Sequence, residues 1–208
     1  MPRQPKHAVD DYAESVVRRR VPAGKYHRLA CERHIRDRKR EGTSGFPYRF
    51  EAALADRFLK FAALVRHYKG EWAGQLVQLS PCQVFRLGSV FGWIRTDVEG
   101  APRRRFRTSY NEIPRKNGKS LEAAIVVDYA TFFDNEPGAE GYTAATKREQ
   151  ALIVFNDAKQ LVRSSGLKNR IEVQSHNMHR VATMQKLEPL SADHDSMDRS
   201  EEHTSELQ

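Results

Sequence analysis

The sequence predicts an α/β domain, with helices flanking a parallel sheet, preceded by a helical segment. Apolar residues recur at helical spacing in the first half of the chain, whereas the second half follows the order strand, loop, helix, strand, helix. The 208 residues are 39% hydrophobic, which is enough to build a core. We therefore expect a helical segment at 1–70, the first part of an α/β domain at 71–198 and a separate tail at 199–208.

The first half contains four predicted helices. Few turn residues interrupt 10–20 and 24–40, and the Gly/Ser/Pro-rich stretch 41–50 is a predicted loop. Apolar residues at intervals of three and four then predict an amphipathic helix. Its expected buried stripe is Leu54, Phe58, Phe61, Val65 and Tyr68. A fourth helix is expected over 80–93, where an N-cap serine precedes a proline.

The second half supplies the predicted sheet. Phe106, Thr108 and Tyr110 alternate with polar residues, which is typical of a strand. A loop punctuated by proline and glycine follows at 114–118. The further expected elements are a buried helix at 120–133, a strand at 140–146, an amphipathic helix at 147–164 and a strand beginning near Val173.

Composition excludes several classes of protein. Two cysteines are too few for a disulfide scaffold and indicate a reducing compartment. The longest fully apolar run, Ala123–Val127, is far shorter than the roughly 20 residues of a membrane span. The N-terminus has no apolar stretch typical of a signal peptide. We expect a cytoplasmic protein without a membrane segment.

The last ten residues, RSEEHTSELQ, depart from every preceding pattern. One back-translation of them resembles a common sequencing-library adaptor, although a disordered acidic tail is the alternative. The segment has one Arg and three Glu, so removing its net charge of −2 from the +8 of the chain leaves +10. We set it aside from the fold, and expect the natural protein to continue beyond residue 198.

The tripeptide Gly118-Lys119-Ser120 has specific chemistry, because it lies between a predicted strand and a predicted helix. Free N–H groups and the helix dipole favour an anion at a helix start. The glycine permits close approach of a phosphate, the lysine reaches the outer phosphates, and the serine hydroxyl can bind Mg²⁺. The standard phosphate-loop pattern requires glycine where Ile113 stands. The expected ligands are ATP and Mg²⁺.

Five segments in order resemble the large terminase subunits of tailed bacteriophages. The central one, PRKNGKS at 114–120, resembles their deviant Walker A loop, in which an arginine lies four residues before the lysine. The others resemble the N-terminal helix, the adenine-contacting Q segment, the second strand with its following helix, and the approach to the third conserved strand. They are AGKYHRLACERHIRD (23–37), LSPCQVFRLGSVFGW (79–93), EPGAEGYTAATKREQALIVFNDA (136–158) and LEPLSADHDSMD (187–198).

The resemblance implies a P-loop NTPase fold of the ASCE or RecA-like type and a role for each loop residue. Gln83 would contact adenine, Arg115 would be an arginine finger supplied in cis, and Lys119 would bind the β- and γ-phosphates. Ser120 would hold Mg²⁺. The nucleotide-binding set also includes Lys116, Asn117 and Gly118. Cys82 stands where the family usually has an aromatic residue.

The resemblance also implies the function of the intact protein. It would form a ring on the portal protein, work with the small terminase subunit, and use ATP hydrolysis to drive double-stranded DNA into the procapsid. A C-terminal endonuclease would cut the DNA. The Walker B strand and the nuclease are expected after residue 198, so we expect this polypeptide to bind nucleotide without turning it over.

Two other functions stay open from the sequence. One is a different P-loop ATPase or kinase, and the other is a basic DNA-binding adaptor in which GKS is accidental. Three basic clusters could bind DNA phosphates or simply be solvated helix faces: 18–20, 36–40 and 103–105.

Some residue types suggest sites but are better interpreted as structural. Cys31 and His34 have metal-like spacing without a second pair, and His176 and His179 have no partners at ligand spacing. The aromatic residues Phe85, Phe91 and Trp93 are expected in the core rather than in a base-stacking platform.

Overall fold

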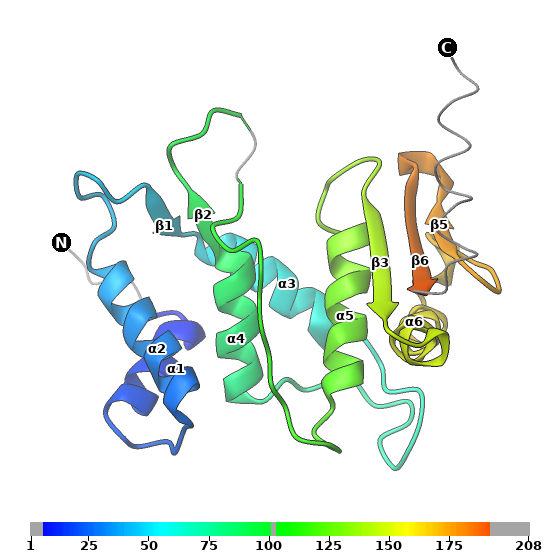
Figure 1. Cartoon of the computed structure of the whole chain (residues 1–208), viewed down its shortest axis with the longest axis horizontal. Coiled ribbons are helices and arrows are strands. Elements are labelled where there is room, and N and C mark those ends of the chain that lie inside the picture. The colour runs from blue at the N-terminus through cyan, green and yellow to red at the C-terminus, as the bar shows by residue number, and fades with distance from the viewer. Residues whose placement is uncertain (1–5, 101–102, 192–208) are drawn as a thin grey trace. The chain divides into compact units, whose positions relative to one another are not determined.

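The computed structural model describes residues 6–100 and 103–191, which form two compact units (Figure 1). The first unit comprises 1–63 and 78–111, and the second comprises 64–77 and 112–208. The chain therefore enters the second unit briefly before returning to the first. The predicted division at residue 70 stays a prediction. The expected tail at 199–208 and the end of the 187–198 segment lie outside the described residues.

The first unit is mostly helical, as predicted. Its elements are α1 (Ala8–Val17), α2 (Lys25–Arg38), β1 (Tyr48–Phe50), all but the last residue of α3 (Ala52–Leu64), α4 (Pro81–Gly92) and β2 (Trp93–Arg95). The structure confirms the helices expected over 10–20, 24–40 and 80–93. The two short strands, which the sequence did not predict, pair antiparallel with Phe50 opposite Trp93.

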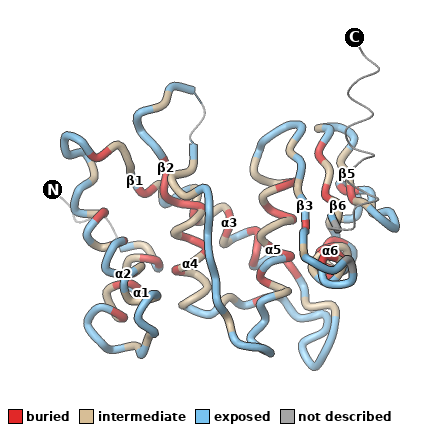
Figure 2. Tube along the Cα trace, in the orientation of Figure 1, coloured by how far each residue is buried: buried red, intermediate tan, exposed pale blue. Residues whose placement is uncertain are grey.

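Close packing joins the helices of this unit around a buried core (Figure 2). The rings of Phe58 and Phe91 stack with their centroids 4.2 Å apart. Gly88 permits α1 and α4 to approach, because a Cβ there would lie 2.5 Å from Cγ2 of Val9. The core assignment of the predicted aromatic residues is confirmed: Phe85, Phe91 and Trp93 are all buried.

The helix that contains the predicted apolar stripe is shorter than expected. Phe58 and Phe61 are buried on α3, but the helix ends at Leu64. The prediction that it continues through Val65 and Tyr68 is wrong, because the chain turns back on itself there. The N–H of Val77 donates to the carbonyl of Val65 at 2.8 Å, so antiparallel pairing replaces the next helical turn.

The second unit is an α/β arrangement with a mixed sheet. Its elements are α5 (Lys119–Phe132), β3 (Glu140–Ala145), α6 (Arg148–Ser164), the 3₁₀ turn η1 (Leu167–Asn169), β4 (Glu172–Val173), β5 (Met178–Arg180), the 3₁₀ turn η2 (Val181–Thr183) and β6 (Gln185–Ser191). The strand order is β3-β6-β5-β4. β3 and β6 run parallel, whereas β5 is antiparallel to both of its neighbours.

The prediction of a fully parallel sheet is therefore not confirmed, and the prediction of a strand at 106–110 is wrong. Residues 106–110 form no strand, and the nearest pairing is a single bridge between Ile94 and Arg104. Phe106 packs against the core of the first unit, but Tyr110 is 86% exposed, so the apolar residues of this segment do not share one buried face. The helices predicted at 120–133 and 147–164 and the strand at 140–146 are confirmed.

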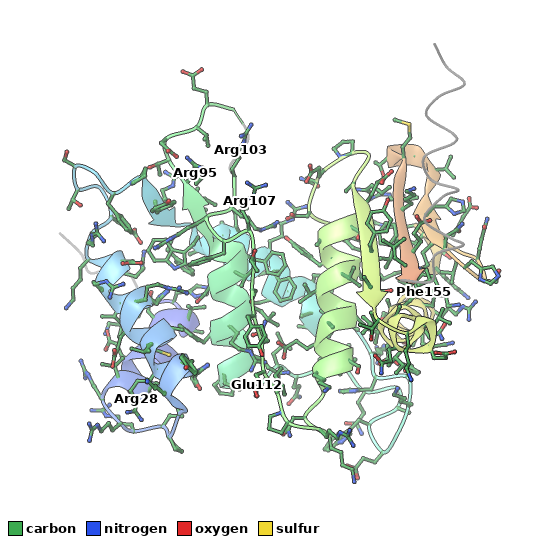
Figure 3. All side chains as sticks on the ribbon, in the orientation of Figure 1. Arg28, Arg95, Arg103, Arg107, Glu112 and Phe155 are labelled. Carbon is green, nitrogen blue, oxygen red and sulfur yellow. The ribbon has the colours of Figure 1, made fainter. Side chains whose placement is uncertain are left out.

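Both helices of the second unit pack on the sheet. A Cβ at Gly141 of β3 would lie 2.0 Å from Oγ1 of Thr131, so glycine permits α5 to lie against the strand. The hydroxyl of Thr143 donates to the carbonyl of Ala151 in α6 at 3.1 Å. Phe155 of α6, labelled in Figure 3, is completely buried. These contacts hold the end of α5 and the start of α6 against β3.

Candidate functional site

The loop before α5 has the backbone geometry of a tight turn into a helix. Lys116 and Gly118 both have positive φ, of 66° and 71°, and Gly118 is the N-cap of α5. The N–H of Glu122 donates to the carbonyl of Gly118 at 2.9 Å, which closes the first helical turn. The N–H groups of the residues between them have no acceptor within the helix. This helix start can therefore accept an anion.

The side chains of the loop increase its positive charge. Arg115, Lys116 and Lys119 are exposed, and none of them forms an ion pair with a described residue. Asn117 has a structural role in the loop. Its Nδ2 donates to the carbonyls of Arg115 at 3.1 Å and Pro114 at 3.4 Å. The amide thus holds the turn in shape while the three cations stay available.

Space is available where a phosphate would lie. A Cβ added at Gly118 would have no atom within 4 Å, and the hydroxyl-bearing Ser120 is half-buried at the second position of α5. In the part of the chain that the structure describes, no group of three or more His, Cys, Asp or Glu side chains could hold a metal ion.

The loop lies at the functional edge of the sheet. β3 and β6 run parallel, and Figure 1 shows α5 starting at the end of the sheet where these two strands finish. Ligands of open α/β sheets bind outside the carboxyl ends of the strands. The consecutive residues Arg115 to Ser120 thus lie at this end of the sheet.

Gln83 belongs to the other compact unit and has a local structural partner. Its Oε1 accepts hydrogen bonds from the backbone N–H and the hydroxyl of Ser80, both at 2.9 Å. Ser80 and Gln83 form a capping box at the start of α4. The sequence proposed this glutamine for adenine recognition, and the structure gives it a role in starting the helix.

Comparison with protein families identifies the chain. The model of the terminase large subunit ATPase domain matches residues 81–205, which is more than half of the sequence. The chain belongs to the terminase large subunit family. The match includes Gln83 and the whole loop at 114–120, and it extends into the 199–208 segment that we set aside. No curated protein and no solved structure matches the chain.

Membership in the terminase family establishes a packaging-motor ATPase subunit in general and implies a P-loop fold. The described second unit is an α/β arrangement in which the loop at 114–118 leads into its first helix, α5, and no named strand lies in the described residues directly before this loop. None of the described helices is both long and apolar enough to cross a membrane.

Several arginines of the basic clusters considered for DNA binding form ion pairs within this terminase chain. Arg105 is the clearest case: its Nη2 lies 2.7 Å from Oδ2 of the buried Asp37, and its guanidinium packs 5.0 Å from the Trp93 ring centroid. Arg38 is likewise paired with Asp10 and Glu41. By contrast, Arg103 is exposed on the segment beside β2, where its carbonyl accepts from the backbone N–H of Arg95 (Figure 3).

His34 has a structural role in the first unit. Nε1 of Trp93 donates to Nδ1 of His34 at 3.0 Å, so Nδ1 is an acceptor and Nε2 carries the proton that is directed 2.7 Å to Asp10. Burial alone would raise the pKa of Asp10, but its bonds with His34 and Arg38 outweigh this and lower that pKa. Burial raises the pKa of the Cys31 thiol to about 12, so the free thiol stays protonated at neutral pH.

One acidic residue in the second unit was not singled out from the sequence. Asp128, in the middle of α5, is 1% exposed, and its Oδ1 has no hydrogen-bond partner among the described residues. Burial raises the pKa of this carboxyl well above its ordinary value. It lies in an apolar stretch of α5, AAIVVDYA (123–130), and only its position on the buried side of the helix could have indicated it.

Proposed function

We propose that this chain supplies the nucleotide-binding part of a motor that drives double-stranded viral DNA into a procapsid. The observation that carries the proposal is the unpaired cluster of Arg115, Lys116 and Lys119 at the start of α5, within the matched ATPase domain. In the intact protein this part would be joined to an endonuclease. It would act as a ring on the portal protein, together with the small terminase subunit, in the bacterial cytoplasm.

Each loop residue has a proposed task. Lys119 holds the β- and γ-phosphates, the backbone N–H groups after Gly118 bind phosphate oxygens, and Ser120 binds the Mg²⁺ that accompanies ATP. Bound Mg²⁺ supplies charge neutralisation at the phosphates. Arg115 stabilises negative charge that develops on the γ-phosphate, as an arginine finger in the same chain. Three cations without ion pairs within the described residues support this assignment.

The first experiment is calorimetric titration of the chain with ATP and Mg²⁺. Binding should be lost in Lys119→Ala and retained in Lys60→Ala, which removes an exposed lysine from α3 in the other unit. Equal binding by the two variants would contradict the phosphate-loop assignment. The expectation that this chain binds nucleotide without turnover stays a prediction, and steady hydrolysis that depends on Lys119 would contradict it.

Two variants test the finer roles. Arg115→Ala in the intact terminase should leave ATP binding in place and reduce turnover by about 10³-fold or more, as for other arginine fingers. Gln83→Ala should reduce the preference for ATP over GTP if this residue contacts adenine. Because Ser80→Ala removes the same helix cap, it controls for the loss of stability alone.

A further inference from the structure

A second basic surface of the second unit lies around a cavity beside η1, β4 and β5. The cavity has a volume of about 330 Å³, and Lys168, Arg170 and Arg180 all line it. Lys168 and Arg170 are exposed, and neither forms an ion pair with a described residue. The floor includes the buried Ile171. Three cations therefore surround one open, partly apolar hollow.

One carboxylate lines this cavity beside the three cations. Glu172 is the lining carboxylate, and its Oε2 lies 3.0 Å from Nε2 of the lining residue His179. Nη1 of Arg180 donates to the carbonyl of Phe132 at 3.3 Å, which holds this guanidinium at the end of α5. Lys168 and Arg170 therefore remain to bind an anion, while the backbone carbonyl of Phe132 holds Arg180 in place.

The charge extends well beyond the cavity. The 22 residues from 159 to 180 contain five Lys or Arg and one Glu, so their net charge of +4 is half of the +8 of the whole chain. Lys159 is fastened to the β4–β5 loop by donating to the carbonyl of Ser175 at 2.9 Å. Burial, and to a smaller extent the neighbouring Arg163, lower the pKa of Lys159. An extended polyanion fits this surface better than a small anion.

The surface is distinct from the nucleotide loop. Arg180 contacts Phe132, the last residue of α5, whereas the loop precedes the first residue of this 14-residue helix. At a rise of 1.5 Å per residue, the two ends of α5 are about 20 Å apart. None of the basic clusters singled out from the sequence includes these residues.

We infer that this basic surface, formed by Lys168, Arg170 and Arg180, binds the phosphate backbone of double-stranded DNA. Duplex DNA carries one negative charge per 1.7 Å of its axis, so a run of cations along one face releases several counterions on binding. Asn169 lines the same cavity and adds an amide donor for a phosphate oxygen. The inference rests on the proposed function for the choice of DNA as the polyanion.

The test measures duplex binding by the chain without nucleotide, by fluorescence anisotropy over a range of salt concentrations. The double variant Lys168→Gln/Arg170→Gln should bind about 10-fold or more weakly at 0.1 M salt, and its log–log salt slope should fall by about 1 to 2. The matched control is Lys25→Gln/Lys60→Gln, which removes two exposed charges from the first unit. The control should change affinity less than threefold.

Three results would overturn the inference. Unchanged affinity in the double variant, or equal weakening in variant and control, would show that this surface is not the DNA site. Displacement of the duplex by inorganic phosphate at matched ionic strength would assign the cavity to a free phosphate. Parallel ATP titrations separate the two proposals: intact Lys119-dependent ATP binding with unchanged DNA affinity would refute this inference alone, and the reverse pattern would refute the proposed function alone.

Discussion

The stability of the chain should depend on pH through Asp128, and replacing this residue by asparagine should remove that dependence. Asp128 is 1% exposed, with an Oδ1 that has no partner among the described residues. Burial raises its pKa well above the ordinary value of 3.8. The folded chain therefore keeps the proton on this carboxyl at pH values where the unfolded chain has released it.

The sign and size follow from proton linkage. Because the folded-state pKa is raised, the folded chain binds more protons than the unfolded chain between pH 3.8 and that raised pKa. The contribution of Asp128 to the free energy of unfolding is fully present below pH 3.8 and is lost as the pH rises through this window. The loss is up to about 1.4 kcal/mol per pH unit.

Urea denaturation at several pH values between 4.5 and 7.5 provides the assay. Asp128→Asn keeps nearly the same shape and stays neutral, so its advantage over the original chain should grow with pH and then level off. The exposed carboxylate Glu71 offers a control, and Glu71→Gln should leave the pH profile unchanged. If the original chain and Asp128→Asn lose stability in parallel as the pH rises, the burial argument is refuted.

Three further substitutions test packing and backbone geometry through the free energy of unfolding in urea. Gly141→Ala should cost about 1–3 kcal/mol because the new Cβ would lie 2.0 Å from Oγ1 of Thr131, and adding Thr131→Ala should recover part of this cost. Trp93→Phe should cost about 1–3 kcal/mol, since it leaves the buried Nδ1 of His34 without its donor; an unchanged midpoint would exclude that bond as a stabilising contact. Gly118→Ala should cost about 1–2 kcal/mol through its φ of 71°, and a stabilised variant would contradict the left-handed geometry.

The helices could be predicted from the sequence because their signals are local. A serine before a proline starts α4, and the Gly-Lys-Ser junction starts α5, within the bounds expected. The same local signals placed the loop residues around one helix end. The start of α5 could therefore be located from the sequence, although the standard phosphate-loop pattern has glycine where Ile113 stands, and nucleotide binding by this loop stays a prediction.

The sheet could not be predicted as well, since its pairing depends on distant residues. β1 pairs with β2 across more than 40 residues, and each strand has only three residues. In β6, Pro189 and the charged Glu188 interrupt the run of apolar residues that is typical of a buried strand, yet this strand pairs with β3 and β5. A strand–helix–strand order indicates a parallel pair, which β3 and β6 form. It gives no sign of the antiparallel β4–β5 hairpin, which lies between β3 and β6 in the sequence and beyond β6 in the sheet.

Gln83 shows how one sequence pattern can have two physical explanations. Serine followed three residues later by glutamine is a capping box, and the same residues resemble the Q segment of the terminase family. Recognition of adenine by an amide uses its oxygen to accept from N6 and its nitrogen to donate to N7. Here the oxygen already accepts two hydrogen bonds from Ser80 at 2.9 Å. An adenine contact would have to share or displace one of them, so helix capping and base recognition compete for the same oxygen atom.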